Sequence, residues 1–201
     1  MSTENETMVW DPLLRLFHWL LVCCVALLFM LEEHFMALHV VIGFTVLGLL
    51  LFRTVWGFIG PPYARFSQFV RPIAHTWHYL KGLPSGQSPH TLGHNPAGGM
   101  MVILLMGTLL LTALTGIMAH GAENRDGPLA GLAFLQGPLG THWFGEVHEL
   151  LAGLLSLLVT LHLGGVLVSS LWYRENLVKS MITGRKRHRG PGPHNGPTKR
   201  T

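Results

Sequence analysis

The stretch VHELLAGLLSLLVTLHLGGVLVSSLW, residues 147–172, decides the fold of this chain. It is almost entirely apolar and long enough to cross a bilayer as a helix. It carries two histidines, His148 and His162, which are fourteen residues apart. At about 100° per residue, fourteen steps return to within about 40° of the starting direction, and a bundle twist of about 20° per heptad removes most of the remainder. Both imidazoles therefore project from one helix face, about 21 Å apart along the axis. One metal ion cannot bridge them, whereas two stacked cofactors could each take one.

The composition places the chain among integral membrane proteins. Hydrophobic residues make up 49% of the 201 residues and charged residues only 12%, which excludes an ordinary water-soluble protein. Thirteen histidines stand against three tyrosines. Because an ionisable side chain inside a membrane is costly, intramembrane histidines are candidates for function.

The apolar runs predict an all-α fold, an integral membrane four-helix bundle. We expect helices at about 13–31, 36–56, 98–119 and 147–172, within one membrane domain of residues 8–187. The start has no basic region and no cleavage signal, so the first helix is expected to stay in the mature protein. The segment 66–80 mixes aromatic and polar residues and is expected to lie along the interface. Residues 188–201 are basic and rich in Gly and Pro, which predicts a disordered tail.

Lysine and arginine predict the orientation. They are concentrated in the loop after the second helix and in the tail after the fourth, and are almost absent from the other two loops. Since basic loops stay inside, both termini are predicted to be cytoplasmic, N-in and C-in. The basic tail is then read as a cytoplasmic anchor beside anionic lipid, and no nucleic-acid partner is expected.

With this topology, four histidines fall into two layers. His18 and His162 lie towards the inner side, and His39 and His148 towards the outer side. A pair of imidazoles on facing helices suits the iron of a b-type haem, since two axial nitrogens allow a redox change with little rearrangement. Two such haems would carry electrons across the bilayer. His120 and His142 are alternative ligands for the outer layer.

Other uses of these histidines are open at this stage. A single membrane histidine often serves as a hydrogen-bonded helix contact or as part of a proton relay. A histidine-dependent proton or metal transporter is therefore the competing class, although the interiors of the predicted helices hold no carboxylates. His75 and His78, three residues apart in the interfacial segment, could bind a metal, but solvated interfacial histidines are the simpler interpretation.

Several motifs resemble one family, prokaryotic cytochrome b561, together with the related cytochrome b subunits of nickel-iron hydrogenases and formate dehydrogenases. The resemblance runs from about residue 8 to 187. Besides the fourteen-residue histidine spacing, the segments that carry it are VWDPLLRLFHW (9–19), Leu38-His39, WGFIGP (56–61), GHNPAG (93–98) and RENLVKSMITG (174–184).

The resemblance implies a di-haem b cytochrome of the bacterial inner membrane. It exchanges electrons between ubiquinone or menaquinone and a redox partner, such as a c-type cytochrome or an iron-sulfur subunit. An anchor subunit of a hydrogenase or dehydrogenase complex is the alternative, and a homodimer is left open. By position, His18 and His162 match the ligands of the inner haem b, and His39 and His148 those of the outer one.

The resemblance also suggests further cofactor residues. Arg15 and Arg53, at the inner ends of their helices, are candidates for pairing with haem propionates, although plain interfacial anchoring is an equal interpretation. Asn95 and Gly98 resemble an Asn-x-Gly stretch that lies near the quinone in the formate dehydrogenase relatives, except that Pro96 and one further residue separate them here. No catalytic triad or phosphate loop is visible, so any reaction of the chain itself is expected to be quinol oxidation.

Overall fold

The computed structural model describes residues 6–31, 35–82, 93–124, 127–129, 131–132 and 137–187. The predicted disordered tail, residues 188–201, lies outside them. In the described part of the chain, four helices are long and apolar enough to cross a bilayer, which confirms the all-α membrane bundle. These helices are α1 (Pro12–Leu31), α2 (Met36–Ile59), α5 (Pro96–Asn124) and α6 (Pro138–Trp172).

The helices extend beyond the predicted limits at the glycine-rich loop. Helix α5 runs on to Asn124 instead of ending near 119, and α6 begins at Pro138, nine residues before the predicted start at 147. Gly137 has extended backbone angles and Pro138 follows it as the first helical residue. Proline suits that position because its missing N–H would have no partner there. The glycine-rich composition before residue 147 led the sequence analysis to place the start of this helix too late.

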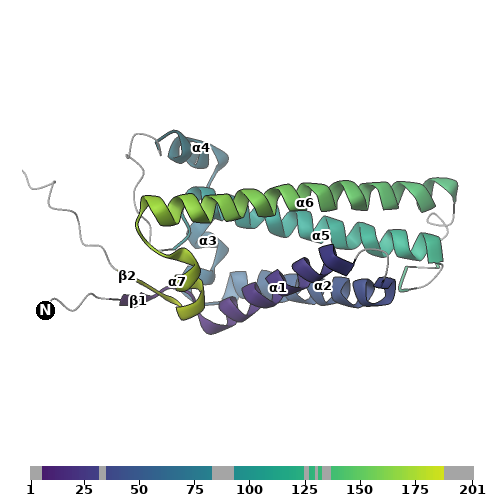
Figure 1. The fold of residues 1–201 in the computed structure, drawn as a ribbon, viewed down its shortest axis with the longest axis horizontal. Coiled ribbons are helices and arrows are strands. Elements are labelled where there is room, and N and C mark those ends of the chain that lie inside the picture. Colours follow the sequence, from purple (N-terminus) through teal and green to yellow (C-terminus); the bar gives the residue numbers. More distant parts are fainter. Residues whose placement is uncertain are drawn as a thin grey trace, which may run out of the picture.

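The four spans form two helical hairpins. Helix α1 packs along α2, α5 packs along α6, and α2 also packs on α5 and so joins the hairpins. Figure 1 shows the four helices running side by side along the long axis. A shared apolar cluster fills the middle of the bundle, and its buried members are Val46, Leu50, Leu109 and Leu155. We call these four residues the central cluster.

The outer faces of the spans are suited to lipid. At most 22% of the apolar window of any span is buried. Large side chains such as Leu51, Leu150 and Leu171 are about two-thirds exposed or more, at 67%, 72% and 71%. Because such an apolar surface is unfavourable in water, the bundle is in contact with membrane lipid.

Both described chain ends lie at the same end of the bundle, which we call the terminal end (Figure 1). Strands β1 (Glu6–Met8) and β2 (Arg185–Arg187) pair there in antiparallel register, Met8 opposite Arg185. Helix α7 (Leu177–Thr183) precedes β2 and closes on Gly184, which has a positive φ of 81°. Glycine adopts this left-handed conformation readily. That the terminal end is cytoplasmic stays a prediction.

Short elements between α2 and α5 cover the rest of the terminal end. They are η2 (Pro62–Ala64), α3 (Phe66–Phe69) and α4 (Ile73–Gly82), so the predicted interfacial segment is two short helices. Helix α4 exposes Ile73 and Trp77, while its Thr76 hydroxyl donates to the carbonyl of Pro96 at 3.3 Å. One face of α4 is thus held to the start of α5 and the other is apolar and exposed, as an interfacial helix requires.

Candidate functional site

The structure brings His39 and His148 together away from the terminal end. Their ring centroids are 6.2 Å apart and the planes make an angle of 72°. His39 belongs to the first turn of α2 and His148 to α6, so the two rings come from different hairpins. The Nδ1 atom of His39 is buried and, among the described residues, has no hydrogen-bond partner. We call these residues the distal pair.

The orientation of His148 is fixed by helix α5. Its Nδ1 lies 2.8 Å from the carbonyl oxygen of Thr112. A carbonyl can only accept, so Nδ1 carries the proton and Nε2 keeps the lone pair that can bind a metal. The ring lies directly on Gly116, since a Cβ built there would be 2.8 Å from the Cε1 of His148. Ligand histidines in metalloproteins are commonly held through their second nitrogen in this way.

His18 and His162 form a second pair near the terminal end. His18 lies in the second turn of α1, and His162 is the last histidine of α6, fourteen residues after His148. The two side chains are close enough to interact electrostatically. The Nδ1 of His18 is buried and finds no hydrogen-bond partner in the described structure. We call these residues the proximal pair.

These two pairs fit a flat cofactor with two axial nitrogens better than an enclosed metal ion. Residues of the central cluster, which lie on α2, α5 and α6, fill the bundle between the pairs. Over the described ranges, no three histidine, cysteine, aspartate or glutamate side chains converge as a metal-ion site would require. Gly43, one turn from His39, leaves open space, because a Cβ there would meet no described atom within 4 Å. Unpartnered ring nitrogens beside open space are what haem ligands need.

Arg53 is a buried cation close to the proximal pair. Only 2% of it is exposed, and its guanidinium stacks over the ring of Phe66 at 4.8 Å. Its Nη1 is buried and, within the described chain, makes no hydrogen bond. Arg15, the other predicted propionate partner, donates from Nη1 to the carbonyl of Ile182 in α7, while its Nε is buried and finds no partner among the described residues. Both arginines therefore keep a buried guanidinium nitrogen that no described residue engages, and the Asp11 carboxylate lies within electrostatic range of Arg53.

His94 is a residue that the sequence analysis did not single out. It packs between the rings of Trp10 and Phe69, at centroid distances of 4.8 and 4.6 Å. Burial, with the nearby charges of Arg53 and Lys186, lowers the pKa of His94 to about 3. It also interacts electrostatically with both histidines of the proximal pair. The GHNPAG motif contains it and was the available signal, but nothing in the local pattern placed its side chain inside.

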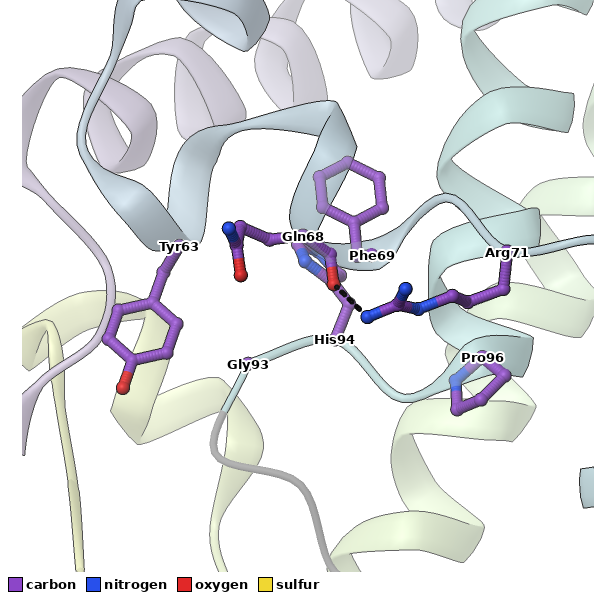
Figure 2. Close-up of a pocket in the computed structure, with 7 residues that line it drawn as sticks. All are labelled: Tyr63, Gln68, Phe69, Arg71, Gly93, His94 and Pro96. Atoms are coloured by element: carbon purple, nitrogen blue, oxygen red, sulfur yellow. Dashed lines mark hydrogen bonds between the residues drawn. The ribbon is translucent and has the colours of Figure 1, made fainter.

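A cavity of about 190 Å³ opens beside His94 at the terminal end. Figure 2 shows the side chains that line it, from η2, α3 and the start of α5. Its polar groups include the Tyr63 hydroxyl, the Gln68 amide and the Arg71 guanidinium. The lining residues are Tyr63, Gln68, Phe69, Arg71, Gly93, His94 and Pro96.

Asn95 and Gly98, the residues predicted near a quinone, make a local contact. The Asn95 Oδ1 accepts a hydrogen bond from the Gly98 N–H at 2.7 Å. This bond satisfies one of the free N–H groups at the start of α5, which is the usual role of asparagine before a helix. Neither residue lines the cavity, although Gly93, His94 and Pro96 beside them do.

The remaining candidate histidines occupy other positions on the helices. His142 is exposed near the start of α6, and His120 lies near the end of α5, where its Cδ2 approaches Gly127. His75 and His78 are exposed on α4. The structure thus brings the rings of His39 and His148 together, and His120 and His142 stay the alternative ligands.

Comparisons with known proteins give one match. The family model described as prokaryotic cytochrome b561 matches residues 9–184, which includes all four spans and both histidine pairs. No curated protein and no solved structure matches.

Proposed function

The chain belongs to the prokaryotic cytochrome b561 family, whose members are membrane proteins that transfer electrons through haem b, and we propose that it binds two such haems and moves electrons across the bilayer. His18 and His162 hold the haem near the terminal end, and His39 and His148 hold the distal one. This proposal rests on one observation: the four histidines form two pairs, and each pair has one member on helix α6.

Bound haem b supplies a one-electron couple, and the residues of the chain set its surroundings. Two neutral imidazoles per iron leave the coordination unchanged between redox states, which keeps the reorganisation small. The apolar central cluster between the pairs excludes water from the interior. The Thr112 carbonyl fixes the tautomer of His148, so its Nε2 would keep the lone pair available to bind the haem iron.

Arg53 pairs with the carboxylates of the haem near the terminal end. Burying a cation costs several kcal/mol unless it is paired and hydrogen-bonded; the Asp11 carboxylate lies within electrostatic range of Arg53, but its Nη1 has no hydrogen-bond partner among the described residues. Haem propionates are anions of the required kind, and the proximal pair lies within electrostatic reach of the same region. Arg15 has a secondary part, because its guanidinium already joins α1 to α7.

Quinone, as ubiquinone or menaquinone, exchanges electrons at the terminal end. The support is the cavity of about 190 Å³ beside His94, which is bounded by the same GHNPAG segment that holds Asn95 and Gly98. From the basic-residue pattern this end faces the cytoplasm of a bacterium. The other redox partner, a c-type cytochrome or an iron-sulfur subunit, then meets the haem on the far side.

The test uses purified protein in detergent. Haem extraction should give about two haem b per polypeptide, and a reduced quinol analogue should produce the haem b reduction bands within the mixing time. If only strong artificial reductants work, the quinone role is wrong and a conduit between two protein partners replaces it. If the protein binds no haem after expression with added haem, a histidine-dependent proton or metal transporter becomes the better interpretation.

A further inference from the structure

We propose that Gly116 is a positioning residue for His148 and thereby sets the redox potential of the distal haem. This inference rests on the proposed haem-ligand role of His148. Gly116 lies in α5, which carries none of the four proposed haem ligands and neither of the two arginines proposed for the propionates. The missing side chain at position 116 lets the Cε1–Nδ1 edge of the imidazole approach the helix and reach its backbone.

The contact is unusually close. A Cβ at Gly116 would be 2.8 Å from the Cε1 and 3.0 Å from the Nδ1 of His148. The same ring nitrogen donates to the carbonyl of Thr112, four residues earlier on the same face of α5, at 2.8 Å. An alanine would therefore occupy the space from which the imidazole makes this hydrogen bond. The ring would have to turn or withdraw from the carbonyl.

This hydrogen bond has an electronic consequence for a ligand. Donation from Nδ1 to a carbonyl raises the basicity of Nε2 and fixes the ring plane. A more basic axial nitrogen stabilises the oxidised iron more than the reduced iron, so the bond holds the potential down. Weakening it should raise the potential of the distal haem and leave that of the proximal haem unchanged.

Glycine at 116 is not explained by the helix itself. Alanine forms helices better than glycine by about 0.8–1.0 kcal/mol. Among the other glycines of helix α5 is Gly107, at which a Cβ would meet no described atom within 4 Å. Both glycines weaken the helix alike, but only the one at 116 lies against a proposed ligand. Gly107 is therefore the matched control.

The experiment compares Gly116→Ala with Gly107→Ala in the haem-loaded protein. Redox titration of the haem bands and electron paramagnetic resonance of the oxidised protein are the readouts, with haem content measured alongside. Gly116→Ala should raise one of the two midpoint potentials and alter one low-spin signal, or release one haem, and Gly107→Ala should leave both unchanged. Identical titrations and signals for Gly116→Ala and wild type overturn the proposal.

A second variant tests the same hydrogen bond in the opposite direction. The Thr115 hydroxyl lies between two carbonyl acceptors, Leu111 at 2.9 Å and Thr112 at 3.0 Å, and so competes in part with His148 for the Thr112 carbonyl. Thr115→Val removes the competing donor at nearly constant volume, so one midpoint potential should fall. This result supports the proposal even if Gly116→Ala fails to fold, whereas an unchanged or raised potential contradicts it. Wild-type protein with no haem refutes the proposed function itself, and the inference with it.

Discussion

A single added methyl group at Gly57 tests how α3 covers the buried Arg53. Gly57 lies in α2, and a Cβ there would be 2.1 Å from the Cε2 of Phe66. Ordinary van der Waals contact begins at 3.4 Å, so the ring must retreat by about 1.3 Å, the difference of the two distances. Since this ring stacks over the Arg53 guanidinium at 4.8 Å, Gly57→Ala should loosen α3 and uncover the cation.

The expected change in the free energy of unfolding combines two destabilising effects and one stabilising effect. Forcing extra volume into a packed site costs about 1–3 kcal/mol, and the weakened stacking on Arg53 costs about 1 kcal/mol more. The better helix propensity of alanine returns about 1 kcal/mol. We therefore expect Gly57→Ala to lower the free energy of unfolding by about 1–3 kcal/mol.

The assay is unfolding by sodium dodecyl sulfate in mixed micelles, followed by far-ultraviolet circular dichroism. Gly48→Ala is the matched control, because Gly48 lies in the same helix and a Cβ there would meet no described atom within 4 Å. The control should be unchanged or up to about 1 kcal/mol more stable. Equal stability of the Gly57→Ala and Gly48→Ala variants would refute the packing of Phe66 on α2.

Three further predictions concern the terminal end. Burial lowers the pKa of folded His94 to about 3 from the usual 6.5, so between these pH values the unfolded chain binds a proton that the folded chain does not. The free energy of unfolding should therefore fall as the pH drops below about 6.5, by up to about 1.4 kcal/mol per pH unit. His94→Gln should flatten this acid dependence of the unfolding free energy, and His75→Gln, at an exposed site, should not. Asn95→Ala should destabilise α5 by about 1 kcal/mol through loss of the cap, as measured by the same unfolding, while Asn95→Asp, which keeps the acceptor oxygen, should retain most of it. A chain ending after Arg187 should keep its haem, but one ending after Gly184 should lose part of it, because it lacks β2 and the buried Lys186; equal haem per protein in both truncations would contradict this.

The spans and the facing histidines could be predicted because they depend on local sequence. An apolar run of sufficient length predicts a membrane helix, and the fourteen-residue spacing of His148 and His162 predicts one face by helix geometry alone. The depth of His18 and His39 then follows from the direction in which each helix runs. The structure places the ring centroids of His39 and His148 6.2 Å apart and His18 within electrostatic range of His162, and their binding of haem stays a proposal.

The missed features depend on contacts between distant segments. The β1–β2 pairing joins residues near 7 to residues near 186, and nothing in either tripeptide indicates a strand. His94 is half-buried because Trp10 and Phe69, from other segments, pack against it. Gly116 looked like any small residue in a membrane helix until the ring of His148 was found against it. Asn95 matched a family motif, but its capping bond to Gly98 is a property of the folded chain.

Haem per polypeptide in single alanine variants of the four histidines tests the central claim most directly. A vacated axial position inside an apolar bundle has no cheap replacement for the lost nitrogen, so each variant should fall from about two haems to about one. His18→Ala and His162→Ala should give one residual spectrum, and His39→Ala and His148→Ala the other. If His39→Ala keeps both haems while His120→Ala loses one, the distal haem is assigned to the wrong helix. Two haems in the His162→Ala variant would contradict the proposal that His162 binds haem. The fourteen-residue spacing on α6 would then serve helix packing alone.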